Sequence, residues 1–323
     1  MALSQSDKHL LYVLQYSGDE PISKVCRKVG IREGTAQGKL NRWISSGVLQ
    51  QRAFINTFLL GASEFEVYFS PSRKPKSAEI AIKKAVMSTP GLRWFYRLAG
   101  RYDYSIGLEA RNVAQVAGLL ESLDGKFPGL LSRKEFGGGI GYWWFGRRYL
   151  APSGARYPHG LEMVANTKAV QIDDVDHRIL QVLGSRQKSS TRDLARALGL
   201  PQSTVAYRVR QLTSSGVIAG APYLPSPSWL GVDVFRLLLS FRCFSQDFHQ
   251  RLFAWARRQT NLVSMLRVLG NWDYTLRFEV RDPAAITEIC DDLKDVFSEE
   301  LVRCEVISVV NEYAFTTYPQ VTP

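Results

Sequence analysis

The sequence predicts an α+β protein in which two winged helix-turn-helix modules alternate with two ferredoxin-like (βαββαβ) sandwich modules. Two observations lead to this prediction. The 323-residue chain repeats its own pattern at a nearly constant offset, and each repeat has a helical segment followed by alternating strand-like and helix-like segments. This length suits about two domains or several smaller ones, and no apolar run approaches the roughly 20 residues of a membrane span.

The repeat is visible in matched segments. KVCRKVGI (24–31) aligns with DLARALGL (193–200) at an offset of 169, and LAGRYDYSIGLEARN (98–112) aligns with VLGNWDYTLRFEVRD (268–282) at an offset of 170. A fixed period marks repeated structural units, so we interpret the chain as two copies of a pair of modules. The predicted bounds are helix-turn-helix at 1–53 and 171–222, ferredoxin-like at 62–150 and 229–318, and a linker at 151–170.

The first module of copy two has the signals of three short helices. Acids at 174 and 176 precede an apolar helical run, which suits the positive end of a helix. In STRDLARALGL, Ser190 or Thr191 can cap a second helix and Gly199 can end it in a left-handed turn. The segment PQSTVAYRVRQLTSSGVI then opens a third helix, and the spacing is that of a helix-turn-helix.

The third helix is the expected recognition helix, since its outward face carries groups that bond to base edges and phosphates. Copy one follows the same plan, but Gly34 and Gly38 lie inside its third helix, where each costs about 1 kcal/mol relative to alanine. The candidate DNA-binding residues are Thr35, Gln37, Lys39, Asn41 and Arg42 in copy one, and Gln202, Ser203, Thr204, Tyr207, Arg208, Arg210 and Gln211 in copy two.

The second module of each copy alternates strands and helices. In copy two the order is VDVFRLLLSFRC, SQDFHQRLFAWARRQTN, LVSMLRVLGNWDYTLRFEVR, DPAAITEICDDLKDVFS and LVRCEVISVVNEYAF. This is strand–helix–strand–strand–helix–strand, a ferredoxin-like split unit. Two helices would cover one face of each sheet, so we expect the second faces to pair with each other. In copy one, the glycine-rich GGGIGYWWFG (137–146) lacks the Lys-Ser/Thr of a phosphate loop, and we interpret it as a bulged, aromatic-rich strand that lines an interface or pocket.

Charge indicates the class of partner. The formal net charge is +11, and residues 1–170 hold 24 Lys and Arg against 13 Asp and Glu, whereas residues 171–323 hold 17 of each. A basic chain without a membrane span favours an anionic partner such as double-stranded DNA. Four dispersed cysteines and four dispersed histidines match no metal spacing. We therefore expect reduced thiols, a cytoplasmic location, no membrane, no metal and no cofactor.

A helix-turn-helix followed by this split unit, with Gly-x-Tyr/Trp-Asp-Tyr in the central hairpin, resembles the Lrp/AsnC family of transcriptional regulators. The chain looks like a tandem fusion of two members. The resemblance implies a non-enzymatic regulator, a homo-oligomer formed through the sandwich modules, and a small effector such as an amino acid. Carried over residue by residue, it points to effector contacts at Gly100, Tyr102, Asp103, Gly270, Trp272 and Asp273. The same residues are also those of a capped turn.

Two alternatives remain at this point. Siroheme decarboxylases look like Lrp/AsnC proteins whose paired sandwiches hold a tetrapyrrole, and two fused copies with basic charge could suit that carboxylate-rich substrate. Against this, no His or Arg cluster is evident in the predicted strands. Trihelical modules also serve as protein-docking domains, so a docking scaffold is the other alternative.

Overall fold

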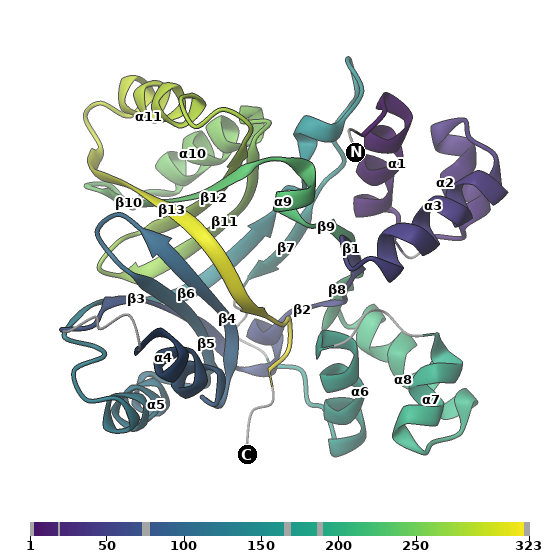
Figure 1. The fold of residues 1–323 in the computed structure, drawn as a ribbon, viewed down its shortest axis with the longest axis horizontal. Helices are drawn as coiled ribbons and strands as arrows, with labels where there is room; N and C mark the ends of the chain where they lie inside the picture. Colours follow the sequence, from purple (N-terminus) through teal and green to yellow (C-terminus); the bar gives the residue numbers. More distant parts are fainter. Residues whose placement is uncertain (1–2, 19, 73–77, 165–168, 186–189, 320–323) are drawn as a thin grey trace.

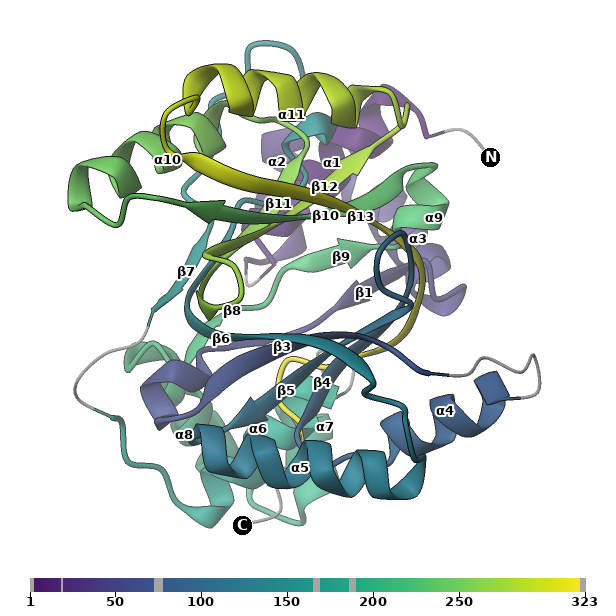
Figure 2. The same ribbon diagram turned by 90° about the vertical axis from the view of Figure 1, so that its left-hand side faces the viewer.

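The predicted fold class is confirmed by the computed structural model, which describes residues 3–18, 20–72, 78–164, 169–185 and 190–319. Helix-turn-helix modules and ferredoxin-like modules both form, and the two ferredoxin-like modules stack with their helices outermost (Figures 1 and 2). The two helix-turn-helix modules lie together beside this stack. They present their helices on one side of the molecule.

Each helix-turn-helix module has three helices. Their bounds are α1 Gln5–Tyr16, α2 Ile22–Val29 and α3 Glu33–Ser45 in copy one, and α6 Asp174–Ser185, α7 Thr191–Leu198 and α8 Gln202–Ser214 in copy two. The local signals act as predicted: the Ser190 hydroxyl accepts the Asp193 N–H at 3.2 Å, and Gly199 ends α7 at φ 66°. Ser190, rather than Thr191, is therefore the cap.

Short strands after each module cross over to the other copy. β1 (Leu49–Gln51) pairs with β9 (Tyr223–Pro225), and β2 (Phe54–Ile55) pairs with β8 (Ile218–Gly220), both antiparallel. A short helical turn follows in each copy, η1 (Thr57–Leu60) and α9 (Pro227–Leu230). These crossed ladders hold the two helix-turn-helix modules to one another through backbone hydrogen bonds.

Both ferredoxin-like modules have the predicted βαββαβ order. Their bounds are β3 Ser63–Ser70, α4 Ala78–Met87, β4 Leu92–Ala99, β5 Tyr104–Ala110, α5 Val113–Lys126 and β6 Arg133–Trp144 in copy one, and β10 Asp233–Phe241, α10 Gln246–Arg258, β11 Leu262–Gly270, β12 Tyr274–Val280, α11 Ala285–Val296 and β13 Leu301–Phe315 in copy two. Each sheet packs one face on its own two helices, with an aromatic and aliphatic core between them.

The two sheets join edge to edge and close. The strand order is β11-β12-β10-β13-β4-β5-β3-β6, and β6 pairs again with β11. The last strand of each module therefore pairs with the second strand of the other, β13 with β4 and β6 with β11. Closure leaves these eight strands without a free edge. The glycines allow it locally, because a Cβ at Gly270 would lie 2.3 Å from the Phe136 carbonyl oxygen.

The predicted linker is more ordered than its composition indicated. Residues 161–164 form a four-residue strand, β7 (Leu161–Val164), which pairs with β6. The ladder joins Trp144 to Leu161 and Gly141 to Val164. Residues 165–168 of the predicted linker lie outside the described residues. Four residues held by backbone pairing are too few to show an alternation of apolar and polar side chains. The sequence therefore did not indicate this strand.

Candidate nucleic-acid interface and internal cavity

The two recognition helices, α3 and α8, expose the faces that the sequence predicted. Apolar residues on the inner side, such as Leu40 and Val205, are buried and hold each helix to its module. Of the candidate DNA-binding residues, Lys39, Thr204 and Arg208 are half-buried, and the others are exposed: Thr35, Gln37, Asn41, Arg42, Gln202, Ser203, Tyr207, Arg210 and Gln211. Both faces are therefore open to solvent.

Hydrogen bonds along each recognition face join residues one helical turn apart. In α8 the Gln211 side-chain amide donates to the Tyr207 hydroxyl at 2.7 Å, and in α3 the Gln37 amide donates to Asn41 at 2.8 Å. Tyr207 is nevertheless 54% exposed. Such pairs at i and i+4 lower the number of rotamers that the polar face samples.

Two cations on these faces are held inside their own modules. Lys39 Nζ lies 2.5 Å from Asp7 Oδ1 in copy one, and Arg208 Nη1 lies 2.6 Å from Asp173 and 3.2 Å from Asp176 in copy two. Burial opposes ionisation of Asp7, but the hydrogen bonds from Lys39 and Ser4 hold the pKa of its carboxyl below its usual value. These ion pairs fasten each recognition helix to the first-helix segment of its module, and the DNA contacts of Lys39 and Arg208 stay a prediction.

The two glycines inside α3 leave part of its face bare. A Cβ at Gly34 or Gly38 would meet no atom within 4 Å, so neither glycine is needed for packing. The corresponding stretch of α8 carries Ser203 and Tyr207 instead. The two recognition faces therefore differ in shape as well as in their hydrogen-bonding groups.

The six candidate effector residues lie at the β4–β5 and β11–β12 hairpins. Asp273 Oδ2 accepts the Phe241 N–H at 2.6 Å, and the Asp273 N–H donates to the Leu239 carbonyl at 2.7 Å. Burial raises the pKa of the Asp273 carboxyl. These contacts are those of a capped turn that ties the hairpin to its neighbouring strand.

The remaining candidate effector residues are either buried in the core or set the backbone conformation of the hairpin. Tyr102 and Trp272 are buried, and Trp272 Nε1 donates to Thr275 Oγ1 at 2.8 Å. Gly100 has φ 123°, which favours glycine, and the Asp103 carbonyl accepts a hydrogen bond from Arg97 at 2.7 Å. The structure brings each triplet together in its own hairpin. None of the six lines the large cavity between the sheets and the helix-turn-helix modules.

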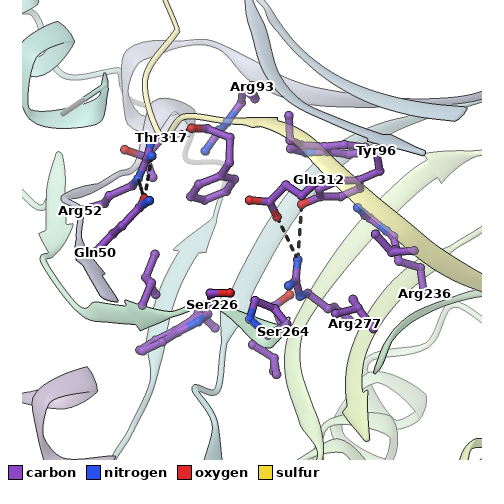
Figure 3. A pocket seen from close by; sticks show the side chains of 18 of the residues that line it. Gln50, Arg52, Arg93, Tyr96, Ser226, Arg236, Ser264, Arg277, Glu312 and Thr317 are labelled. Atoms are coloured by element: carbon purple, nitrogen blue, oxygen red, sulfur yellow. Dashed lines mark hydrogen bonds and ion pairs between the residues drawn. The ribbon is translucent and has the colours of Figure 1, made fainter. Parts of the chain in front are cut away.

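That cavity has a volume of about 760 Å³. The barrel strands form one side of it and the crossed β1–β9 and β2–β8 ladders form the other (Figure 3). Its aromatic wall comes from β2, η1, β4 and β6 of copy one and from β13 of copy two. It consists of Phe54, Phe58, Trp94, Tyr96, Tyr142, Trp144 and Phe315. Two aromatic residues of the glycine-rich segment, Tyr142 and Trp144, thus line a pocket.

Buried ion pairs surround the cavity. Arg147 makes two hydrogen bonds to Glu279, at 2.8 and 3.0 Å, and the Tyr149 hydroxyl donates to the same carboxylate at 2.6 Å. Arg277 lies 3.1 Å from Glu279. Burial opposes ionisation, but Arg147 and Arg277 hold the pKa of Glu279 below its usual value. This carboxylate is therefore charged and fully satisfied.

Two further arginines, Arg93 and Arg236, are also paired with carboxylates. Arg93 lies 3.4 Å from Glu64 and 3.5 Å from Glu109, and burial raises the pKa of Glu109 to about 7 in spite of Arg93. Arg236 pairs with Glu66, and its guanidinium carbon lies 4.5 Å from the centre of the Trp94 ring. Each arginine is already neutralised, at least in part, by a carboxylate of the protein.

The sequence analysis missed this arginine cluster. Arg93, Arg236 and Arg277 come from three different strands, and the sequence does not show that those strands face one cavity. A partial signal was present, since Arg236 is the single cation of β10 and Arg277 that of β12, although Arg93 shares β4 with Arg97. A charge at such a position has to be paired. Histidines are absent from the residues that line the cavity.

No helix within the described residues is long and apolar enough to cross a membrane. Nor does the described part of the chain contain a group of three or more His, Cys, Asp or Glu residues that could hold a metal ion. The four cysteines are free thiols.

Comparison with known proteins identifies the helical module first. Residues 172–219 match the model for a winged helix-turn-helix DNA-binding family. Over 143 residues the chain is 25% identical to an uncharacterized HTH-type transcriptional regulator of Pyrococcus horikoshii, which covers 44% of this chain and 92% of that protein. Over 141 residues it is 31% identical to the HTH-type transcriptional regulator FL11 of Pyrococcus furiosus, again 44% of this chain and 92% of that protein.

A solved structure resembles nearly the whole chain. The siroheme decarboxylase NirDL, in complex with an iron-uroporphyrin III analogue, superposes with a TM-score of 0.60 over 97% of this chain and 93% of its own. The two sequences are 11% identical, so the likeness concerns the fold alone. The chain belongs to the Lrp/AsnC family of helix-turn-helix transcriptional regulators.

Proposed function

We propose that this protein is a sequence-specific DNA-binding transcriptional regulator that arose as a tandem fusion of two family members. The observation that carries the proposal is the pair of exposed polar recognition faces on α3 and α8, held in one molecule by the crossed ladders. Such helices enter the major groove and contact base edges. One chain then supplies the two recognition helices that a dimer supplies elsewhere. Its DNA partner places it in the cytoplasm.

The two faces assign different roles to the two copies. In copy two, Gln202, Ser203, Tyr207 and Gln211 supply the base-edge contacts, and Arg210 supplies a phosphate contact. In copy one, the bare stretch at Gly34 and Gly38 favours close approach of the helix backbone to the DNA. A single chain therefore binds an asymmetric site, and a homo-oligomer formed through the sandwich modules could restore symmetry.

Affinity selection from random duplex DNA, followed by sequencing, tests this function. We expect an enriched asymmetric motif and an affinity that falls steeply with salt, because phosphate contacts release counterions. Gln211→Ala should relax specificity at one half of the motif, and Asn41→Ala should do so at the other half. Lys84→Ala, an exposed change on α4, is the matched control and should leave the motif unchanged. Salt-sensitive binding with no enriched motif contradicts the proposal, as does no binding at all, which favours the docking scaffold.

A tetrapyrrole decarboxylase is the second candidate, favoured by the whole-chain fold likeness to NirDL and by the arginine-lined cavity. Three observations weigh against it. All the lining arginines except Arg52 are paired with Glu64, Glu66 or Glu279, the lining residues include no histidine, and the exposed recognition faces would have no role. Addition of iron-uroporphyrin discriminates the two. A shifted Soret band with no DNA binding would favour the enzyme.

A further inference from the structure

We propose that Cys290 and Cys304 form a redox modification site, at which hydrogen peroxide oxidises the two thiols to an intramolecular disulfide. Cys290 lies on α11 and Cys304 on β13, so the bond would fasten the second helix of the copy-two ferredoxin-like module to its last strand. The site uses none of the recognition residues and none of the residues that line the cavity. The inference therefore goes beyond the proposed function and does not depend on it.

The two thiols are already in contact. α11 packs on the outer side of the sheet that contains β13 (Figure 2), and the Cys304 S–H donates a hydrogen bond to Cys290 Sγ with 3.8 Å between the sulfur atoms. A disulfide has an S–S distance of about 2.0 Å, so the sulfur atoms have to approach by about 1.8 Å. The packing of helix on sheet therefore holds together two thiols that are 14 positions apart in the chain.

The surroundings of the pair favour a thiolate on Cys290. The hydrogen bond from Cys304 holds the pKa of the Cys290 thiol below its usual value despite burial, and the Lys294 ammonium, one turn along α11, acts in the same direction. The same hydrogen bond, together with burial, raises the pKa of Cys304. The thiolate is the nucleophilic form of cysteine, and redox-sensitive cysteines often have a second cysteine beside them. Cys290 is therefore the thiol that attacks, and Cys304 is the one that resolves.

The oxidation takes two steps. The Cys290 thiolate attacks one oxygen of hydrogen peroxide, so that an S–O bond forms, the O–O bond breaks, and the departing hydroxide takes up a proton; a sulfenic acid remains. The Cys304 thiol then loses its proton and its sulfur attacks Cys290, so that the S–S bond forms, the S–O bond breaks, and the hydroxide leaves with that proton as water. Two thiols are thus oxidised to one disulfide, and one peroxide is reduced to two waters.

The other two cysteines are internal controls. Cys243 is half-buried, and a hydrogen bond with Ser245 lowers the pKa of its thiol. Cys26 is buried in the first helix-turn-helix module, and burial raises the pKa of its thiol. Neither contacts another thiol within the described part of the chain. Cys243 therefore tests whether a lowered pKa suffices without a neighbouring cysteine.

Peptide mapping of the reduced full chain tests the site. The protein is treated with a few equivalents of hydrogen peroxide, free thiols are blocked with N-ethylmaleimide, and trypsin is added without reductant. Trypsin cleaves after Arg281, Lys294 and Arg303, so the two cysteines fall on separate peptides, 282–294 and 304–323. We expect mass spectrometry to find these peptides joined, two hydrogens lighter than their sum, and separated again by dithiothreitol.

Variants assign the two roles. Cys304→Ser should leave Cys290 as a sulfenic acid that dimedone traps, and Cys243→Ser should leave the yield of joined peptide unchanged. Lys294→Gln, an exposed change on α11, should slow the joining several-fold, because the thiolate fraction of Cys290 falls. Two results for the wild type overturn the proposal: both thiols of the pair blocked while Cys243 is oxidised, or Cys290 joined as often to Cys243 or Cys26 as to its neighbour.

Discussion

Removal of one partner of the Glu66–Arg236 ion pair should strongly destabilise the paired sheets. Glu66 is the fourth residue of β3 and Arg236 the fourth residue of β10, so equivalent positions of the two modules meet. Glu66 is 0% exposed, and its second oxygen accepts a hydrogen bond from Thr275. Arg236→Met keeps an unbranched apolar stem but leaves a buried carboxylate without its counter-charge.

We expect Arg236→Met to lower the free energy of unfolding by about 3–5 kcal/mol, the usual cost of removing one partner of a buried pair. The cation–π contact with Trp94 is lost as well and lies within that range. Urea unfolding at pH 7, followed by tryptophan fluorescence, measures the change as a lower midpoint at an unchanged slope. The double variant Arg236→Met with Glu66→Gln should recover much of the loss, since no buried charge remains.

The pH dependence gives an independent check. Burial raises the pKa of Glu66, so between its unfolded value near 4.5 and its folded value the native state binds more protons than the unfolded state. Stability in that window rises as the pH falls. Without Arg236 the raised pKa moves further up, and the gap between variant and wild type should narrow towards pH 5. A loss below about 1 kcal/mol, or a gap that is the same at pH 5 and pH 8, would refute the reasoning.

Three further predictions follow from the same structure. Because Arg208 fastens α8 to α6, both Arg208→Ala and Asp176→Asn should weaken DNA binding several-fold in a fluorescence-anisotropy titration. Tighter binding by Asp176→Asn would instead show that Arg208 contacts phosphate directly. Burial raises the pKa of Glu109 to about 7, so ionisation of this group should lower the free energy of unfolding by up to about 3 kcal/mol as the pH rises from 4.5 through 7. Glu109→Gln should reduce this pH dependence in urea unfolding at pH 5 and 8. An unchanged pH dependence would show that another group causes it. Gly270→Ala should lower the free energy of unfolding by about 1–3 kcal/mol, because its Cβ would lie 2.3 Å from a backbone oxygen of β6. Gly118→Ala, on an exposed helix face, is the control and should not destabilise the protein. Equal melting temperatures of the two variants would contradict the close approach.

The asymmetry of the two copies also follows from the Glu66–Arg236 contact. If two identical copies packed in this arrangement, like charges would face each other at the same place, two carboxylates or two guanidinium groups. Such a contact is unfavourable in a buried site. The two modules of this chain are therefore matched to each other, and neither could replace its partner without a change at this position.

The sequence by itself determined the elements whose signals are local. The cap at Ser190, the left-handed turn at Gly199 and the apolar side of α8 depend on residues within one or two turns, so the helix-turn-helix and its exposed face could be predicted. The order of strands and helices in the ferredoxin-like modules has the same origin, because each run is bounded by its own turn residues.

Only the tertiary structure decided how those elements meet. Glu66 and Arg236 are 170 residues apart, and Lys39 and Arg208 each pair with an acid more than 30 residues away, Asp7 and Asp173. Edge pairing of β13 with β4 and of β6 with β11 closes the barrel and creates the cavity that Glu312 faces. The physical reason is that helix caps and turns are satisfied within a few residues, whereas sheet edges and buried charges find partners only when distant segments pack.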